Sequence, residues 1–389
     1  MKFTKMSLIA ALLVGSSAFA VDNIEVAGNA KLFYSTDDSN NVDLFDKTNA
    51  FGQAALGLGV TADLADGVKA GTHLTALSTL GLQGQLVDGV WEGTNGVDDS
   101  YWFDEAWIAK TMGKTTVKIG RMQLDTPLVF SEDWSIAINS FEAAVVVNQD
   151  IQDTTIVGGY VGGSNGAKEN TGGLVIANMN DKGNTNFSQF YQGAYTIGAV
   201  NNSYAPLTAQ AWYYNASHIL SAYWLQADLN LDGILAGAQY TATDFNDDNV
   251  DSTYAFAVMA GYEMKDTFVA KVAFSQVCED GAAGANLSGS GMSKLYTESW
   301  YTWIAAQQDT KAYNLTLEAP VKDIVDLGLY YTYADQDEAT GGNDLTELTL
   351  TASKSFGSLD TAVAYINTVA GNQDNDAVNT LQVFLTYNY

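Results

Sequence analysis

The sequence predicts an all-β fold, a transmembrane antiparallel up-and-down β-barrel of about 18 strands. Apolar and other residues alternate with a period of two in segments of about 10 residues or more, the length of a tilted strand that crosses a bilayer. No stretch of the mature chain approaches the run of about 18 apolar residues that a helical span requires. Aromatic residues gather near the segment ends, where membrane-interface girdles lie.

Residues 1–20 form the first element, a cleaved signal peptide. Lys2 and Lys5 supply a positive start, residues 6–15 are largely apolar, and Ala18-Phe19-Ala20 matches an A-x-A cleavage site. A membrane anchor is the alternative, but the apolar run is far shorter than the roughly 20 residues of a spanning helix. We therefore expect residues 21–389 to form a single barrel domain, exported and integral to the bacterial outer membrane.

The first and last segments of this domain show the alternation clearly. One face of the first segment carries Ile24, Val26, Gly28, Ala30, Leu32 and Tyr34. One face of the last carries Leu381, Val383, Leu385, Tyr387 and Tyr389. A soluble β-sandwich also has uncharged inner faces, but its strands average only about 5 to 6 residues. Strand length therefore favours the membrane barrel.

The turns give the direction of each strand if both termini lie in the periplasm. Outward strands are expected to begin near Ile24, Val68, Thr115, Thr154, Leu207, Gly233, Thr267, Val325 and Ser358. Returning strands are expected to end near Leu64, Met112, Asn148, Val200, Leu229, Met264, Ala319, Lys354 and Tyr389. This gives eighteen strands, provided that residues 277–310 form one long outer loop. Residues 122–139 then form the third outer loop.

Composition excludes several classes of protein. The chain has 45 Asp and Glu against 17 Lys and Arg, for a formal net charge of −28, and Arg121 is its only arginine. Nucleic-acid binding needs clustered Lys and Arg, so we expect no nucleic-acid partner. Cys278 is the only cysteine, which rules out an intramolecular disulfide. Neither His73 nor His218 lies in a catalytic motif, so we expect no enzyme activity.

Two neighbouring segments resemble the Campylobacter-type major outer membrane porins and, more remotely, the specific-channel porins. They are Gly120-Arg121-Met122-Gln123-Leu124-Asp125-Thr126-Pro127-Leu128 and Asn139-Ser140-Phe141-Glu142-Ala143. The resemblance implies an eighteen-stranded homotrimer whose third outer loop folds into the lumen and narrows the pore. It also implies a preference for cations and a calcium ion near the constriction. The C-terminal Tyr389 replaces the usual Phe but keeps the aromatic end that barrel-assembly machinery recognises.

Charged residues in and beside the third loop are the candidate constriction. Arg121 precedes the loop and could either anchor it through a carboxylate or contact solutes. Asp125, Glu132 and Asp133 lie within the loop, where carboxylates would enrich cations, although Asp125 could instead be a turn residue. Glu105 and Lys118 lie on the adjacent strands, either as part of the constriction or as ordinary lumen charges.

Other inward positions follow from strand parity. Lys31, Lys69, Lys271 and His73 are expected to face the lumen. Glu298 lies in the long seventh loop, and if that loop also folds inward, Glu298 could join Asp125 around a structural Ca²⁺, which takes six to eight oxygen ligands. No cofactor is otherwise expected.

The sequence therefore predicts a general diffusion porin that passes small hydrophilic solutes, preferably cations, across the outer membrane. Lipid, these solutes and the barrel-assembly machinery are its expected partners. A substrate-specific channel for small charged nutrients is one alternative. A barrel scaffold with a surface adhesion role is another.

Overall fold

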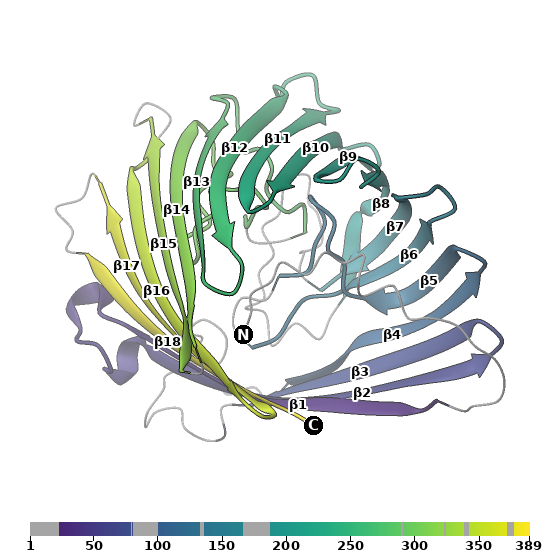
Figure 1. Ribbon diagram of the computed structural model, residues 1–389, viewed down its shortest axis with the longest axis horizontal. Helices are drawn as coiled ribbons and strands as arrows, with labels where there is room; N and C mark the ends of the chain where they lie inside the picture. The colour runs from purple at the N-terminus through teal and green to yellow at the C-terminus, as the bar shows by residue number, and fades with distance from the viewer. Residues whose placement is uncertain are drawn as a thin grey trace.

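A computed structural model describes residues 23–78, 80, 100–132, 136–165, 187–288, 291–322, 324–337, 342–371 and 377–389. Over these residues eighteen antiparallel strands form one closed sheet (Figure 1). Each strand pairs with its neighbours in sequence, and β1 pairs with both β2 and β18, which closes the barrel. The predicted fold class is confirmed. Among the described residues no helix is long and apolar enough to span a membrane.

The strands have the following bounds. They are β1 (Glu25–Asp37), β2 (Ala50–Ala65), β3 (Val68–Ser78), β4 (Ser100–Met112), β5 (Thr115–Met122), β6 (Phe141–Asn148), β7 (Thr154–Ser164), β8 (Ser188–Asn201), β9 (Leu207–Ala216), β10 (Leu220–Leu231), β11 (Ile234–Phe245), β12 (Thr253–Met264), β13 (Phe268–Val277), β14 (Thr310–Val321), β15 (Val325–Gln336), β16 (Leu345–Phe356), β17 (Leu359–Ala370) and β18 (Val378–Asn388). Every predicted periplasmic strand end lies within two residues of these bounds. The strand-like residues 295–306 lie in the loop between β13 and β14, as strand direction required.

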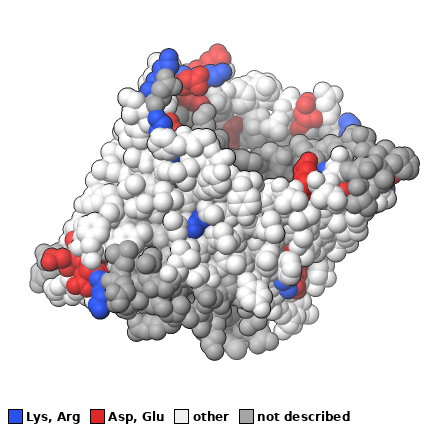
Figure 2. Space-filling model, turned by 90° about the horizontal axis from the view of Figure 1, so that it is seen from below, with Lys and Arg blue, Asp and Glu red and all other residues white. Residues whose placement is uncertain are grey.

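The outer wall of the barrel is apolar. Along β12 the side chains of Tyr254, Phe256 and Val258 are exposed, whereas Ala255 and Ala257 between them are completely buried against the interior. Other strands alternate in the same way, and Figure 2 shows a broad uncharged wall with charged residues gathered mainly toward its margins. An apolar belt around a closed barrel is what hydrocarbon contact requires, and such barrels belong to bacterial outer membranes. The chain is therefore an integral outer-membrane protein.

Two irregularities in the wall lie close to the lumen site. A β-bulge interrupts the pairing of β3 with β4, because His73 pairs with Glu105 while Leu74 pairs with Phe103, which leaves Asp104 as an extra residue. Gly120 on β5 has φ +129°, and a Cβ there would lie 2.2 Å from the carbonyl oxygen of Ala106. The glycine of the Gly120-Arg121 pair is thus required by the close approach of β4.

The interior is filled from one side by two inward-folded loops. They are L3 (residues 123–140) and L7 (residues 278–309), the third and seventh outer loops in the predicted orientation. Their apolar residues pack with inward residues of β5 to β10 and β12 to β15 in one large buried cluster. A smaller cluster joins Ile136 and Ala137 of L3 to Phe33, Ala55, Leu77 and Trp102 on β1 to β4.

Candidate pore constriction

L3 begins with a compact turn. Thr126 Oγ1 donates to the carbonyl oxygen of Val129 at 2.7 Å, and Asp125 and Phe130 form an isolated β-bridge. The N–H of Leu124 donates to Ser131 Oγ at 3.2 Å, which closes the base of the turn. Pro127 fixes one φ angle between these contacts. The Thr-Pro sequence therefore forms a turn that can enter the lumen with few unsatisfied backbone groups.

The tip of this turn rests on the barrel wall and on L7. Leu124, Leu128 and Val129 are buried in the large apolar cluster, next to Tyr214 of β9. The N–H of Leu128 donates to Tyr214 Oη at 3.4 Å, and its carbonyl oxygen accepts from the N–H of Leu287 in L7 at 2.9 Å. The prediction that the third loop folds into the lumen is confirmed.

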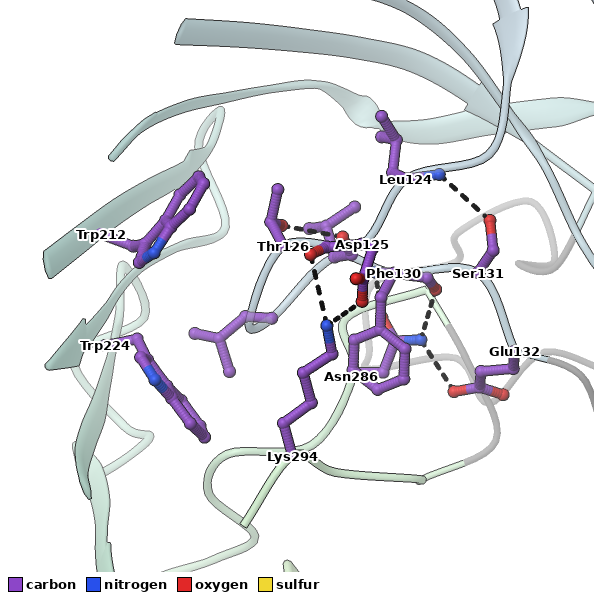
Figure 3. Close-up of polar contacts among 12 residues, drawn as sticks. Leu124, Asp125, Thr126, Phe130, Ser131, Glu132, Trp212, Trp224, Asn286 and Lys294 are labelled. Atoms are coloured by element: carbon purple, nitrogen blue, oxygen red, sulfur yellow. Dashed lines mark hydrogen bonds and ion pairs between the residues drawn. The ribbon is translucent and has the colours of Figure 1, made fainter. Parts of the chain in front are cut away.

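Asn286 of L7 acts as an adapter between the two loops (Figure 3). Its Nδ2 donates to the carbonyl oxygen of Phe130 and to Glu132 Oε1, both at 2.8 Å, while its Oδ1 accepts from the N–H of Phe130 at 3.2 Å. Asn286 and Glu132 are both buried. One amide thus satisfies a backbone donor and acceptor of L3 and also holds Glu132, which points into this contact.

An ion pair joins the same two loops. Lys294 Nζ donates to Asp125 Oδ1 and, at 3.3 Å, to the Asp125 carbonyl oxygen, and it lies 4.8 Å from the centre of the Phe130 ring (Figure 3). Burial lowers the pKa of Lys294, while the neighbouring Asp125 carboxylate opposes that shift. Asp125 is therefore a partner of a lysine from L7, and the simple turn-residue alternative is incomplete.

L7 is itself fixed to opposite walls of the barrel. Glu347 of β16, only 1% exposed, accepts hydrogen bonds from the backbone N–H groups of Trp300, Tyr301 and Thr302 at 2.8 to 3.2 Å. On the other side Tyr296 Oη donates to Asp228 Oδ1 of β10 at 2.5 Å. L7 therefore crosses the lumen and supports L3 from behind.

Glu298 stabilises L7 internally. Its carboxylate accepts from the N–H of Ser293 at 2.7 Å, from Ser293 Oγ and from the N–H of Ser299 at 3.1 Å. Burial raises the pKa of Glu298 to about 7, despite these hydrogen bonds, which act in the opposite direction. Each of Asp125 and Glu298 thus has its own partners, and no group of three or more His, Cys, Asp or Glu that could hold a metal ion occurs in the described part of the chain. The calcium ion that the resemblance implies stays a prediction.

A polar pocket of about 140 Å³ lies between L3 and the wall of β1 to β4. Its lining residues are Asn29, Lys31, Ala55, His73, Thr75, Asp104, Glu105, Gln123, Ile136, Ala137 and Ile138. Lys31 Nζ donates to the carbonyl oxygen of Ile136 at 3.1 Å, so β1 holds the returning half of L3. His73 Nδ1 lies 2.7 Å from Oδ1 of the buried Asp104. The inward prediction is confirmed for both Lys31 and His73.

Glu105 and Lys118 extend this charged surface along the wall. Trp107 Nε1 donates to Glu105 Oε2 at 2.8 Å, and Lys118 Nζ lies 4.2 Å from the centre of the Trp107 ring. Lys118 alternates with the exposed, outward Ile119, which places its side chain on the lumen face. Both side chains therefore lie on the lumen face of the wall beside L3, and their role in a constriction stays a prediction.

Arg121 does not line the pore. It shares the outward face of β5 with Ile119, and its cross-strand partner Glu142 shares the outward face of β6 with the exposed Val146. Arg121 Nε and Nη2 donate to Glu142 Oε1 at 3.1 and 3.0 Å, and Nη1 donates to the carbonyl oxygen of Phe103. The prediction of a pore-facing Arg121 is wrong, because the alternation of inward and outward side chains along β5 continues through this charged residue. The hydrogen bonds of Arg121 join β5 to β4 and β6, and none of them holds L3.

The remaining predicted residues have mixed outcomes. Asp133 lies outside the described residues. Lys69 faces the lumen with Asp63, 3.4 Å away, and Lys271 alternates with the exposed Val272. Sequence reasoning missed Asn286, Lys294, Glu347 and Asp104. For Asp104 a signal existed in the sequence Tyr101-Trp102-Phe103-Asp104-Glu105. Two adjacent carboxylates follow three consecutive aromatic residues there, and two adjacent charged residues break the period of two.

Comparison with known proteins shows that the fold of this chain is similar to that of solved structures. A scan against protein-family models and a search of the curated proteins each find no match. Among solved structures the chain is similar to OccK8 (OprE) of Pseudomonas aeruginosa, with 13% identity, 95% of this chain and 98% of that chain covered, and a TM-score of 0.73. OccAB1 of Acinetobacter baumannii gives 13% identity, 95% and 97% coverage, and a TM-score of 0.73. These likenesses show the fold, and the resemblance to Campylobacter-type porins stays a prediction.

Proposed function

We propose that this chain is a substrate-specific channel that passes small charged solutes across the outer membrane. The observation that carries the proposal is the pocket between L3 and β1 to β4, where Lys31, His73 and Glu105 place charges of both signs around a small volume. A solute that passes there loses bulk water and meets fixed charges at close range, which discriminates by charge and size. L3 and L7 support this proposal because their mutual contacts hold the constriction in one shape.

A preference for cations is the second part of the proposal. Among the described strand residues that face the lumen by alternation, carboxylates outnumber ammonium groups. The carboxylates are Glu25, Asp37, Asp63, Asp104, Glu105, Asp228, Glu263, Glu318, Asp326, Glu347 and Asp360, and the ammonium groups are Lys31, Lys69, Lys118 and Lys271. An excess of one charge inside a low-dielectric wall enriches the opposite ion.

The packing of the two loops distinguishes the proposed specific channel from a general diffusion porin. A general porin needs a wide aqueous passage, whereas here two loops pack together inside the barrel and share a buried apolar cluster with its wall. The comparisons support the barrel fold of such a channel over nearly the whole chain. The homotrimer, recognition by barrel-assembly machinery and surface adhesion stay predictions.

Planar-bilayer recording tests the proposal. The purified protein should give stepwise conductance with a reversal potential that indicates cation preference. Ethylammonium or propionate should block the current saturably, whereas a neutral polyol of similar size should not.

A pair of matched variants locates the selectivity. Glu105→Gln should lower the cation preference, because it removes a carboxylate from the pocket wall. Glu142→Gln makes the same chemical change on the outer wall and should leave the preference unchanged. Anion preference in the wild type, or equal effects of both variants, would contradict the proposal.

A further inference from the structure

We propose that His73 and Asp104 set the ion selectivity of the pore according to pH, an inference that rests on the proposed channel function. The bulge in β4 is the first observation. It inserts Asp104 beside Glu105, so that two consecutive carboxylates line the lumen pocket, where regular alternation would place only one. A bulge beside a functional site commonly redirects a side chain, and this one directs Asp104 at the imidazole of the neighbouring strand.

The contact between the two residues is close and sheltered. His73 Nδ1 lies 2.7 and 2.8 Å from the two carboxylate oxygens of Asp104. The Asp104 side chain is 3% exposed and the His73 side chain 24% exposed. Asp104 therefore depends on His73 as its partner, while His73 keeps an open side toward the pocket, where protons and solutes reach it.

The charged groups around His73 fix the direction of the effect. Lys31 faces it from β1, and Asp104 and Glu105 face it from β4. The described parts of β2 and L3 that line the pocket contribute Ala55, Gln123 and residues 136–138, which do not titrate. With a neutral imidazole, two carboxylates and one ammonium leave the pocket with a net negative charge. With a protonated imidazole, the pocket is neutral.

The consequence is a change of selectivity in the pH range where histidine titrates. As the pH falls from about 8 to about 5.5, His73 gains a proton and cation enrichment at the constriction weakens. Because the chain has only two histidines, the second provides an internal control. His218 is exposed in the short loop between β9 and β10, away from the described pocket lining.

The test is the reversal potential in a salt gradient, recorded on the full-length protein at about pH 8 and about pH 5.5. In the wild type the cation-to-anion permeability ratio should fall by about two- to tenfold at the lower pH. His73→Gln should abolish this fall, and His218→Gln should retain it. Glu298→Gln should also retain it, which separates the effect from the L7 carboxylate whose pKa is about 7.

A second variant guards against a trivial loss of structure. His73→Lys keeps a permanent positive charge, so its permeability ratio at about pH 8 should match the wild-type ratio at about pH 5.5. Heat-modifiable migration in detergent gels checks that each variant forms a barrel. Absence of channels in the wild type would overturn the proposed function, whereas channels whose selectivity ignores pH, or ignores His73, would overturn this inference alone.

Discussion

Two ion pairs of similar exposure have different structural roles, since one joins neighbouring strands and the other joins two loops. Arg121 and Glu142 are 30% and 48% exposed, and Lys294 and Asp125 are both 31% exposed. The first pair joins directly opposed residues of β5 and β6, whose backbones are already hydrogen-bonded. The second joins residues 169 positions apart on two loops. An ion pair matters most where few other contacts hold the two segments together.

The comparison also shows what sets the shape of the pore. The outer-wall pair sits on a sheet that would keep its geometry without it. The loop pair acts together with Asn286 and the Leu287 backbone to determine where L3 lies in the lumen. Changes at the loop contact should therefore alter conductance, and changes at the wall pair should not.

The largest effect is expected from Asn286→Ala. It leaves the N–H and carbonyl oxygen of Phe130 and the carboxylate of Glu132 without their amide partner, at a cost of about 2–4 kcal/mol to the loop contact. Limited proteolysis should then cut L3 or L7 faster, and single-channel current should become noisier. Asn249→Ala, in the exposed loop between β11 and β12, is the matched control and should change neither measurement.

Lys294→Met should have the next largest effect. It leaves Asp125 charged and half-buried without its ammonium partner, which weakens the loop contact by about 1–3 kcal/mol. Single-channel conductance should rise as L3 loosens. Adding Asp125→Asn should recover much of the wild-type conductance, because residue 125 then no longer carries the charge that Lys294 balanced. Unchanged conductance in the single variant would show that the pair does not hold L3.

Glu298 should make the stability of L7 depend on pH. Its pKa rises from an ordinary value of 4.5 to about 7 in the folded loop, so the folded loop binds its proton more tightly. The stabilisation is complete below about pH 4.5 and is lost as the pH rises through about 7, a change of about 1–2 kcal/mol after allowance for partial exposure. Proteolysis of L7 should therefore accelerate from about pH 5 to about pH 8. Glu298→Gln should remove this dependence, and acceleration in the opposite direction would refute it.

The smallest effect is expected at the outer-wall pair. A double-mutant cycle with Arg121→Met and Glu142→Gln should give a coupling energy of about 0.2–1 kcal/mol from thermal unfolding in detergent. Conductance and selectivity should stay at the wild-type values, because neither side chain reaches the lumen. A change in selectivity on Arg121→Met would mean that the outward assignment is wrong.

Most of the fold could be predicted because strands carry their signal locally. The predicted starts at Val68, Thr115 and Thr154 coincide with the observed ones. Period-two alternation also assigned Lys31, His73 and Lys118 to the lumen correctly. Applied consistently, the same parity places Arg121 with Ile119 on the outer face, but its position before L3 suggested the pore. Asp104 was not predicted to face the lumen, because a β-bulge interrupts the alternation at this residue.

The sequence by itself determined the barrel, its strand directions and the extent of L3 and L7, because each rests on periodicity, turns and chain length within a few tens of residues. Only the tertiary structure decided which loop residues meet. Asn286 reaches Phe130, Lys294 reaches Asp125 and Glu347 reaches the backbone of residues 300–302 across the lumen. Such contacts depend on how two loops pack inside a closed wall, and no local pattern encodes that packing.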